Sequence, residues 1–239
     1  MIFLPINRRD ISLRYFLIYI IMNYEAIHIQ REVEKPFHIV IESSGKESKA
    51  IRKNRIYNLT LTRFINKLLT FYPRRNGLIV DFLPICYVSL YAGLLGFKTF
   101  YINANHHYKT YLDYSIIMND IDTIDYIQNW RTLNSLVKDK DITLQICDDL
   151  DKAIICKRVI KNNKLRNLIL LRNKKYTPQK LYDTIFYLHQ HGFTFFKLRS
   201  NDTTDNYLDW RDGEWGDFDP ILCIHNSSKY RNNFIVYFD

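Results

Sequence analysis

The chain has 239 residues and a mass of 28.8 kDa, with 47% hydrophobic and 25% charged residues. These proportions suffice for one large folded domain and exclude an intrinsically disordered chain. The formal net charge of +9 favours a polyanionic partner such as RNA or an anionic surface, although compositional drift alone produces the same charge.

The first segment contains a short apolar run, Tyr15–Met22, preceded by three arginines. This run is shorter than the ~20 residues that a membrane-spanning helix requires. No small-residue cleavage site follows it before Glu25. We therefore expect a buried strand or short helix here, no transmembrane segment in the chain, and no removed presequence.

Three segments precede the central part of the chain. His38–Glu42 has the composition of a strand, and Thr60–Phe71 carries an apolar stripe at helical spacing. Between them, the cationic run Lys49–Arg55 is expected to form a solvated loop face or a patch that contacts phosphate groups. We expect residues 1–72 to be an N-terminal extension of strands and helices, packed on a core domain of residues 73–239.

The stretch Asn76–Asn105, NGLIVDFLPICYVSLYAGLLGFKTFYINAN, has the order strand, turn, helix, strand. The first strand ends at Asp81, the helix spans Tyr87–Leu95 with Gly96 at its end, and the second strand is Lys98–Ile102. A nucleotide-type cofactor normally binds where the first strand turns into the helix. In this chain that turn, FLPIC, contains no glycine.

This stretch resembles the first βαβ unit of the FkbM-type methyltransferases, a Rossmann-like family that uses S-adenosylmethionine (SAM). The family pattern reads roughly VVDVGANIGYFSLLAAKLGAKVYAFEPNP. The matching segments are Ile79–Asp81, Val88–Ala92, Leu95–Gly96, Phe100–Ile102 and Asn105. The resemblance implies an α/β, Rossmann-like methyltransferase fold. Its central sheet would be mostly parallel, with helices on both faces and an antiparallel C-terminal edge.

The sequence departs from the family pattern at the positions that the resemblance implies for SAM binding. Leu83 and Tyr87 replace two glycines, and Asn103 replaces a glutamate that binds the ribose hydroxyl groups. Pro84 removes an amide donor from the same turn. Asp81 is retained, although an acidic residue at a strand end also caps a following turn. We expect Asp81, Leu83, Tyr87 and Asn103 to form a vestigial SAM pocket.

A helix-compatible segment, Tyr108–Met118, follows the βαβ unit. The next aspartates, Asp120, Asp122 and Asp125, resemble an acidic helix edge rather than a metal site, whose carboxylates converge from several places. The cysteines show no CxxC pair and are expected to be buried free thiols. They are Cys86, Cys147, Cys156 and Cys223. No metal is therefore expected.

Basic residues gather around the next predicted strands. Ile142–Cys147 is expected to pair with a strand at Ala153–Cys156, and Leu168–Leu171 is a further strand. Cationic clusters lie on both sides of the last of these strands. The candidate nucleic-acid-binding residues of the whole chain are Lys49, Arg52, Lys53, Arg55, Arg74, Arg75, Lys157, Arg158, Lys161 and Lys164.

The last helix has clear end signals. Thr177 is placed to cap it, Pro178 to begin it and Gly192 to follow its end, before a strand at Phe193–Leu198. An acidic stretch then predicts a long surface loop, and two further strands predict a closing hairpin. These last segments are Asn201–Asp219, Ile221–Ile224 and Phe234–Phe238.

Two functions of different class follow from the sequence. The first is a catalytically inactive, methyltransferase-like subunit with a structural or RNA-contacting role in a large assembly, without cofactor or catalytic residue. A compositional bias typical of an AT-rich genome favours a mitochondrial ribosome over a cytoplasmic location. Its partners would be RNA or neighbouring proteins. The second function, which the resemblance implies, is an active SAM-dependent O-methyltransferase that acts on a glycan or small molecule.

Overall fold

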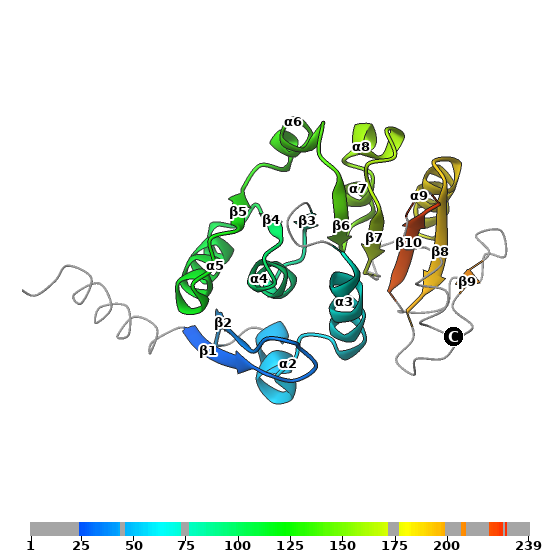
Figure 1. Cartoon of the computed structure of the whole chain (residues 1–239). Coiled ribbons are helices and arrows are strands. Elements are labelled where there is room, and N and C mark those ends of the chain that lie inside the picture. Colours follow the sequence, from blue (N-terminus) through cyan, green and yellow to red (C-terminus); the bar gives the residue numbers. More distant parts are fainter. Residues whose placement is uncertain are drawn as a thin grey trace, which may run out of the picture.

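A computed structural model (Figure 1) describes residues 24–43, 46–72, 77–171, 177–198, 207–208, 220–226 and 228. Within these residues, an eight-stranded sheet has the strand order β5-β4-β3-β6-β7-β10-β8-β9. Its strands are β3 (Leu78–Asp81), β4 (Lys98–Ile102), β5 (Ile124–Ile127), β6 (Ile142–Cys147), β7 (Asn167–Leu170), β8 (Phe193–Lys197), β9 (Tyr207–Leu208) and β10 (Ile221–His225).

The sheet is mostly parallel with an antiparallel C-terminal edge, as predicted. β3 pairs in parallel with β4 and β6. β5 pairs in parallel with β4, and β7 pairs in parallel with β6. β10 lies antiparallel between β7 and β8, and β9 pairs antiparallel with β8. Both edges of β10 are therefore paired within the described residues.

Helices cover both faces of the sheet, which the two buried clusters of apolar side chains demonstrate. The helices of the first face are α3 (Leu59–Phe71), α4 (Tyr87–Leu94) and α5 (His106–Asn119), and α2 (Lys46–Asn54) contributes Ile51 to the same cluster. Those of the second face are α6 (Leu133–Val137), α7 (Leu150–Ala153), α8 (Lys157–Lys161) and α9 (Pro178–Gln190), with a 3₁₀ turn, η1 (Trp130–Thr132), before α6. The predicted fold class is therefore confirmed.

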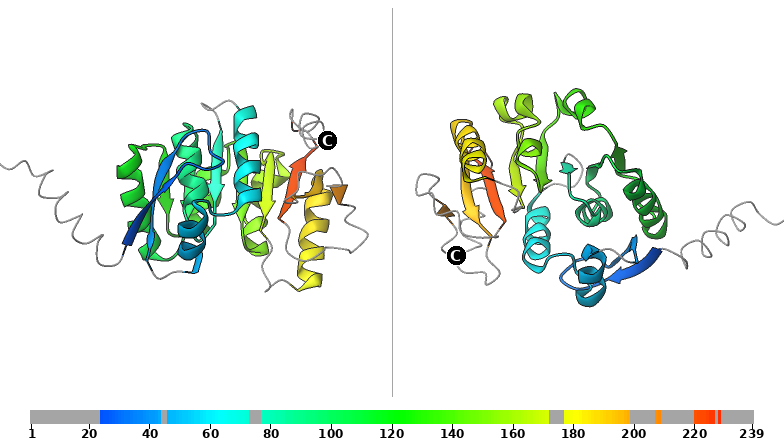
Figure 2. Two further views of the ribbon diagram at one scale, coloured as in Figure 1. Left: turned by 90° about the horizontal axis from the view of Figure 1, so that it is seen from below. Right: turned by 180° about the vertical axis from the view of Figure 1, so that it is seen from behind.

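A separate antiparallel hairpin, β1 (Tyr24–Ile29) and β2 (Phe37–Glu42), packs against α5 (Figure 2). Side chains of α5 accept hydrogen bonds from the backbone of β2. Val40 N donates to Ser115 Oγ at 2.8 Å, and His38 N donates to Asn119 Oδ1 at 2.7 Å. These bonds satisfy backbone groups that an uncovered strand edge would leave open to pairing with another chain.

The N-terminal segments share their core with the sheet. One buried cluster includes Ile27 and Ile39 of the hairpin, Leu68 of α3 and Ile79 of β3. The predicted boundary at residue 72 therefore separates segments that pack together, and the division into two domains stays a prediction.

The central βαβ unit forms as predicted from β3, α4 and β4. Gly96 ends α4 with a φ of 88°, a left-handed conformation that favours glycine. Gly93 allows α4 to approach the start of β5 and the segment before it, because a Cβ there would lie 2.8 Å from Ile124 and 2.9 Å from Ile121. A small side chain is thus required on a helix buried along nearly its whole length.

One predicted element near the middle of the chain is wrong. Ala153–Cys156 is not a strand, because α7 ends at Ala153 and α8 begins at Lys157. β6 has no edge to offer such a strand, since β3 and β7 pair with it on either side. Asp149 also caps α7, accepting a hydrogen bond from Asp151 N at 2.8 Å.

Two polar runs also differ from expectation. The cationic run that begins at Lys49 lies in and just after α2 rather than in a loop, because Ile51 is fully buried and helical spacing turns the cations outward. Asp120 ends α5 with a φ of 53° and Asp125 lies in β5, so the aspartates do not form one helix edge.

The last predicted helix and strand are confirmed as α9 and β8. Thr177 Oγ accepts a hydrogen bond from Lys180 N at 3.2 Å, and Gly192 has a φ of 80°. Of the predicted acidic loop, Tyr207–Leu208 form β9. The rest of that loop, Tyr15–Met22 and Phe234–Phe238 lie outside the described residues. In the described part of the chain, each helix is too short or too polar to cross a bilayer.

Candidate cofactor site

The strand order reverses between β3 and β6. From β3 the chain passes through α4 to β4 on one side, whereas from β6 it passes through α7 and α8 to β7 on the other. In open α/β sheets, ligands bind beyond the carboxyl ends of the strands at such a point. The turn Phe82–Cys86 leaves β3 there, so the predicted SAM positions lie where this fold places a ligand.

Asp81 ends β3 and is fully buried. Its Oδ1 accepts a hydrogen bond from Leu83 N at 2.9 Å. Its Oδ2 accepts from Ser89 N at 3.0 Å and from Ser89 Oγ at 2.6 Å. The carboxyl group therefore joins the end of β3, the following turn and α4, which is the capping role that the sequence left open.

Burial raises the pKa of Asp81 to about 7, and the hydrogen bonds from Ser89 and Leu83 only partly offset this effect. The nearby Asp148 raises the pKa further. When the group is protonated, the Ser89 hydroxyl can reverse its role and accept a hydrogen bond from the carboxyl group.

We expect Asp81 to make stability fall as pH rises. Its folded pKa of about 7 exceeds the ordinary value of 3.8, so its contribution is fully present below pH ~4 and is lost as pH rises through ~7. The fall attributable to this group is on the order of 4 kcal/mol. Urea unfolding between pH 4 and 8 should show that Asp81→Asn lacks this fall, relative to wild type.

The matched control is Asp125→Asn, which changes an aspartate with a half-exposed side chain and should keep the wild-type pH profile. His38 and His225 have lowered pKa values because of burial, and their contributions are lost as pH falls. Wild type and both variants contain these histidines, so their contributions cancel when the pH profiles are compared. Parallel profiles for wild type and Asp81→Asn would contradict the raised pKa.

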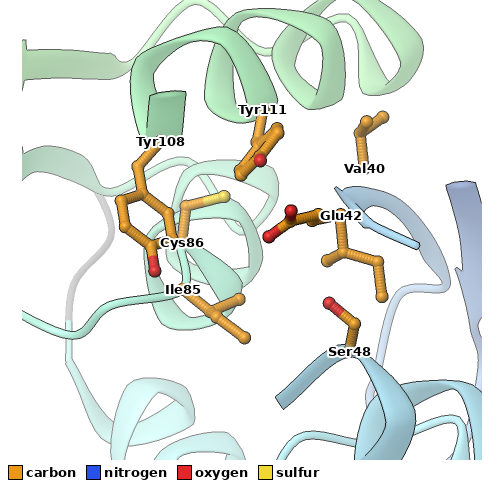
Figure 3. Close-up of a pocket in the computed structure, with 8 residues that line it drawn as sticks. Val40, Glu42, Ser48, Ile85, Cys86, Tyr108 and Tyr111 are labelled. Atoms are coloured by element: carbon orange, nitrogen blue, oxygen red, sulfur yellow. The ribbon is translucent and has the colours of Figure 1, made fainter. Parts of the chain in front are cut away.

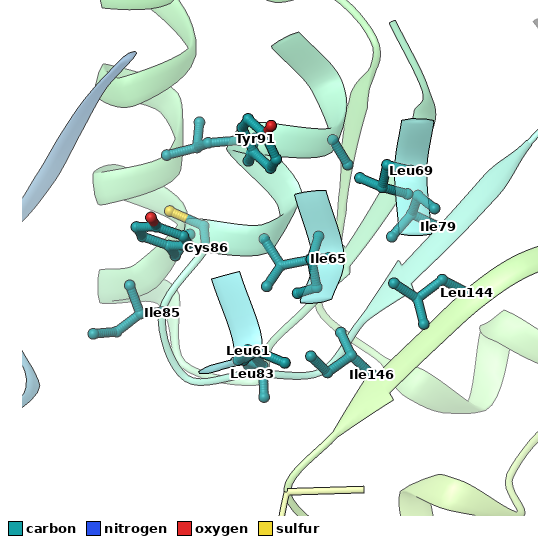
Figure 4. Packing of buried hydrophobic residues seen from close by; sticks show 14 of the residues in the cluster. Leu61, Ile65, Leu69, Ile79, Leu83, Ile85, Cys86, Tyr91, Leu144 and Ile146 are labelled. Carbon is teal, nitrogen blue, oxygen red and sulfur yellow. The ribbon is translucent and has the colours of Figure 1, made fainter. Parts of the chain in front are cut away.

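Leu83 and Tyr87 point into the first buried cluster. Leu83 is fully buried in the same cluster as Leu61 and Ile146 (Figure 4). The Tyr87 ring begins α4 and lies edge-on to Phe37, with 5.3 Å between centroids. Both side chains therefore fix the turn and the start of α4 in the core.

The carboxyl end of β4 is tied to the same turn by Tyr101, which is fully buried. Its hydroxyl group donates to Pro84 O at 3.1 Å and accepts from Asn103 Nδ2 at 3.3 Å. Burial raises the pKa of Tyr101, so the hydroxyl group keeps its proton and remains a donor. This side chain joins the two strand ends between which the predicted site lies.

Asn103 has both ends of its side chain engaged. Besides the bond to Tyr101, its Oδ1 accepts from Asn105 N at 3.0 Å, and its backbone carbonyl accepts from the Tyr126 hydroxyl. Sequence analysis singled out Asn103 but missed Tyr101. The available signal was their spacing, because residues two apart in a strand lie on one face.

The turn is also held on the β6 side. Phe82 N donates to Ile146 O at 2.9 Å, and the Phe82 ring lies in the second buried cluster. Lys152 Nζ reaches Phe82 O at 3.5 Å and Asp148 Oδ1 at 3.0 Å. Contacts from β4, β6 and α4 thus fix the turn in place.

A small pocket lies beside the turn, between β2, α2 and α5 (Figure 3). Its lining residues are Val40, Ile41, Glu42, Ser48, Ile85, Cys86, Tyr108 and Tyr111. The pocket volume is about 30 Å³, whereas small-molecule sites enclose roughly 300–1,000 Å³. This volume suits one or two water molecules. Neither Leu83 nor Tyr87 lines the pocket.

The structure does not gather the predicted cations into one patch. Lys49, Lys53 and Arg55 are exposed in or beside α2, and Arg52 Nε pairs with Glu25 at 2.5 Å. The other described cations lie on and after α8, on the opposite side of the molecule from α2 (Figure 1). Arg74 and Arg75 lie outside the described residues.

All four cysteines are free and buried, as predicted. Burial raises the pKa of Cys86, Cys147, Cys156 and Cys223, which keeps the thiols protonated and unreactive. Over the ranges that the structure covers, no group of three or more His, Cys, Asp or Glu residues could hold a metal ion.

Solved structures with a similar fold include an rRNA methylase from Streptococcus thermophilus, with a TM-score of 0.51 and 10% identity over 71% of this chain and 98% of that one. The chain has a Rossmann-like methyltransferase fold. A Thermus thermophilus 16S rRNA N2 G1207 methyltransferase, in complex with AdoMet and guanosine, has a TM-score of 0.51 and 11% identity. The alignment covers 85% of this chain and 51% of that protein.

A third methyltransferase-fold neighbour, a SAM-dependent methyltransferase from Agrobacterium tumefaciens, has a TM-score of 0.50 and 10% identity over 83% of this chain and 69% of that one. No family model and no curated protein matches the chain. At these identities the likeness is one of fold, and it does not single out the FkbM type.

Proposed function

We propose that this chain is a methyltransferase-like domain that neither binds SAM nor transfers methyl groups, and that acts as a structural, RNA-contacting subunit of a larger assembly. The hydrogen bond from the Tyr101 hydroxyl to Pro84 O, at 3.1 Å, is the observation that carries this proposal. It joins the ends of β3 and β4 with a buried side chain, where the adenosyl group would have to lie.

The residues around this bond do not fit the cofactor. Asn103, at the ribose-binding position of the resemblance, uses its amide and its oxygen on Tyr101 and Asn105. Asp81 already accepts three internal hydrogen bonds. Leu83 and Pro84 stand in the turn that would have to approach SAM closely, and proline offers no amide donor. SAM binding would therefore require this turn to be rebuilt.

The proposed partner is RNA because the net charge of +9 favours a polyanion. Two of the solved structures of similar fold are named as acting on rRNA, which supports the same partner class. The compositional bias of the chain supports a mitochondrial location, and within it a place in the mitochondrial ribosome. The predicted cations on α2 and around α8 are the candidate contact residues.

The alternative is an active, FkbM-like SAM-dependent O-methyltransferase acting on a glycan or small molecule. The retained Asp81 at the end of β3 favours it, as does a fold shared with a protein solved in complex with AdoMet. In that case the turn would have to move so that the Tyr101–Pro84 bond opened.

Isothermal calorimetry and thermal unfolding with SAM decide between the two functions. We expect no heat of binding and no change in melting temperature at 1 mM SAM. A ligand present at 100 times its Kd stabilises by about 2.7 kcal/mol, which raises the melting temperature of a domain this size by several degrees. An active methyltransferase of the same fold is the positive control. A rise of that size for this chain would support the enzyme and overturn the proposal.

A further inference from the structure

Two turns lie side by side at the amino ends of β6 and β7. Ile142 N donates to Lys164 O at 2.8 Å, and Arg166 N donates to Ile142 O at 2.9 Å. These bonds place the turn of residues 138–141 against the turn of residues 161–164. Figure 1 shows α6 and α8 next to each other at this end of the sheet.

The two turns and α8 carry a concentration of positive charge. Residues 138–141 and 157–166 together contain seven cations and two carboxylates, which gives them a net charge of +5. We call the seven cations the amino-edge cluster: Lys138, Lys140, Lys157, Arg158, Lys161, Lys164 and Arg166. Three of them, Lys138, Lys140 and Arg166, were not among the candidates that the sequence indicated.

The local carboxylates neutralise little of this charge. Asp141 lies 3.4 Å from Arg166 and has a side chain 60% exposed, and Asp139 lies 3.9 Å from Lys138 and is 70% exposed. Exposed pairs of this kind are weak and strongly screened by salt. Lys164 Nζ donates to the backbone carbonyl of Asp139 at 3.0 Å, rather than to the carboxylate of that residue.

The cations in and beside α2, Lys49, Arg52, Lys53 and Arg55, are less suited to binding a polyanion. Arg52 there pairs with Glu25 at 2.5 Å and donates to Ser43 O at 2.7 Å. Glu42 lies in the adjoining strand and lines the neighbouring pocket. The amino-edge cluster therefore presents the stronger uncompensated positive field of the two predicted regions.

We infer that the amino-edge cluster binds the phosphate backbone of RNA, an inference that rests on the RNA partner of the proposed function. Lysine ammonium groups contact phosphates as point charges and release counterions, so the contact is independent of base sequence. The cluster lies at the amino ends of the strands, whereas the candidate cofactor site lies at their carboxyl ends. RNA binding through the cluster therefore leaves the turn after β3 untouched.

The test measures binding of a labelled RNA hairpin to the full chain by fluorescence anisotropy at several salt concentrations. The variant Lys138→Gln with Lys161→Gln removes two exposed charges without touching a buried residue. We expect its affinity to fall about tenfold, and the slope of log K against log salt to fall by roughly 1.5–2. Circular dichroism melting should match wild type.

The comparison variant is Lys49→Gln with Lys53→Gln, which removes two exposed charges from α2. We expect it to retain the wild-type slope. Equal losses in both variants, or a larger loss in the α2 variant, would overturn the assignment. Wild-type binding to poly-glutamate but not to RNA would overturn it in favour of an acidic protein partner.

These outcomes are separate from those for SAM. If the chain binds SAM and the Lys138→Gln, Lys161→Gln variant still loses RNA affinity, the inactive-enzyme proposal is refuted and this inference stands. Absence of both SAM binding and RNA binding would refute the inference and leave the closed turn unaffected.

Discussion

Replacing Asp81 by alanine is expected to lower the free energy of unfolding by about 3 kcal/mol at pH 4. The substitution removes the side chain that makes three hydrogen bonds and leaves its buried partners, Leu83 N, Ser89 N and the Ser89 hydroxyl group, without that contact. Each such loss costs roughly 1–3 kcal/mol, and neighbouring losses are not additive. At pH 4 the carboxyl group is protonated in the folded state and close to its ordinary pKa in the unfolded state, so folding carries little of the protonation cost that alanine would remove.

Urea denaturation monitored by circular dichroism measures this change. The control is Asp125→Ala, because Asp125 is 54% exposed and pairs with Lys98 at 2.8 Å on the surface. Its effect should stay below about 1 kcal/mol. Equal effects of the two substitutions would show that Asp81 does not hold the turn to α4.

Replacing Tyr101 by alanine is expected to cost about 3–5 kcal/mol, the usual range for deleting a large buried aromatic side chain. Replacing it by phenylalanine keeps the ring and removes only the hydroxyl group. That loss should cost about 1–2 kcal/mol, because Pro84 O then lacks its bond from Tyr101. The difference between the two variants separates the packing of the ring from the bond that ties β4 to the turn.

The same denaturation experiment includes Tyr182→Phe as its control. Tyr182 lies on α9 and is 40% exposed, so removal of its hydroxyl group should change stability by less than about 0.5 kcal/mol. If Tyr101→Phe proved as neutral as Tyr182→Phe, the Tyr101–Pro84 bond would not be stabilising the closed turn.

The βαβ unit was predictable because its signals are local. Asp81 ends an apolar strand, the run Tyr87–Leu95 has helical length, and Gly96 supplies the left-handed residue that ends the helix. Thr177 and Gly192 mark the ends of α9 in the same way. Each of these signals depends on neighbouring residues, so no knowledge of the tertiary structure was needed.

The strand predicted at Ala153–Cys156 failed for the opposite reason. A run of four apolar residues fits a short strand, a buried turn or a helix end equally well. The choice depends on whether a strand edge is available, and β3 and β7 already occupy both edges of β6. Information of this kind lies in the pairing of segments far apart in the sequence.

The candidate site shows the same division. Leu83, Tyr87 and Asn103 stand out in the sequence by their difference from a family pattern, whereas the packing of Leu83 and Tyr87 into the core is visible only in the fold. The spacing of Tyr101 from Asn103 did not reveal its contact with Pro84, because that contact spans seventeen residues and depends on the parallel pairing of β3 with β4.

The sequence by itself determined the βαβ order, the strand that ends in Asp81 and the positive charge, because these depend on composition and short-range periodicity, and its resemblance to a family pattern implied the fold class. The tertiary structure alone decided that Tyr101 joins β4 to the turn after β3 and that the turns before β6 and β7 bring their cations together. Both arrangements arise from chain segments that meet only when the sheet forms. A side chain's partners across such a distance follow from strand order and register, which local patterns do not encode.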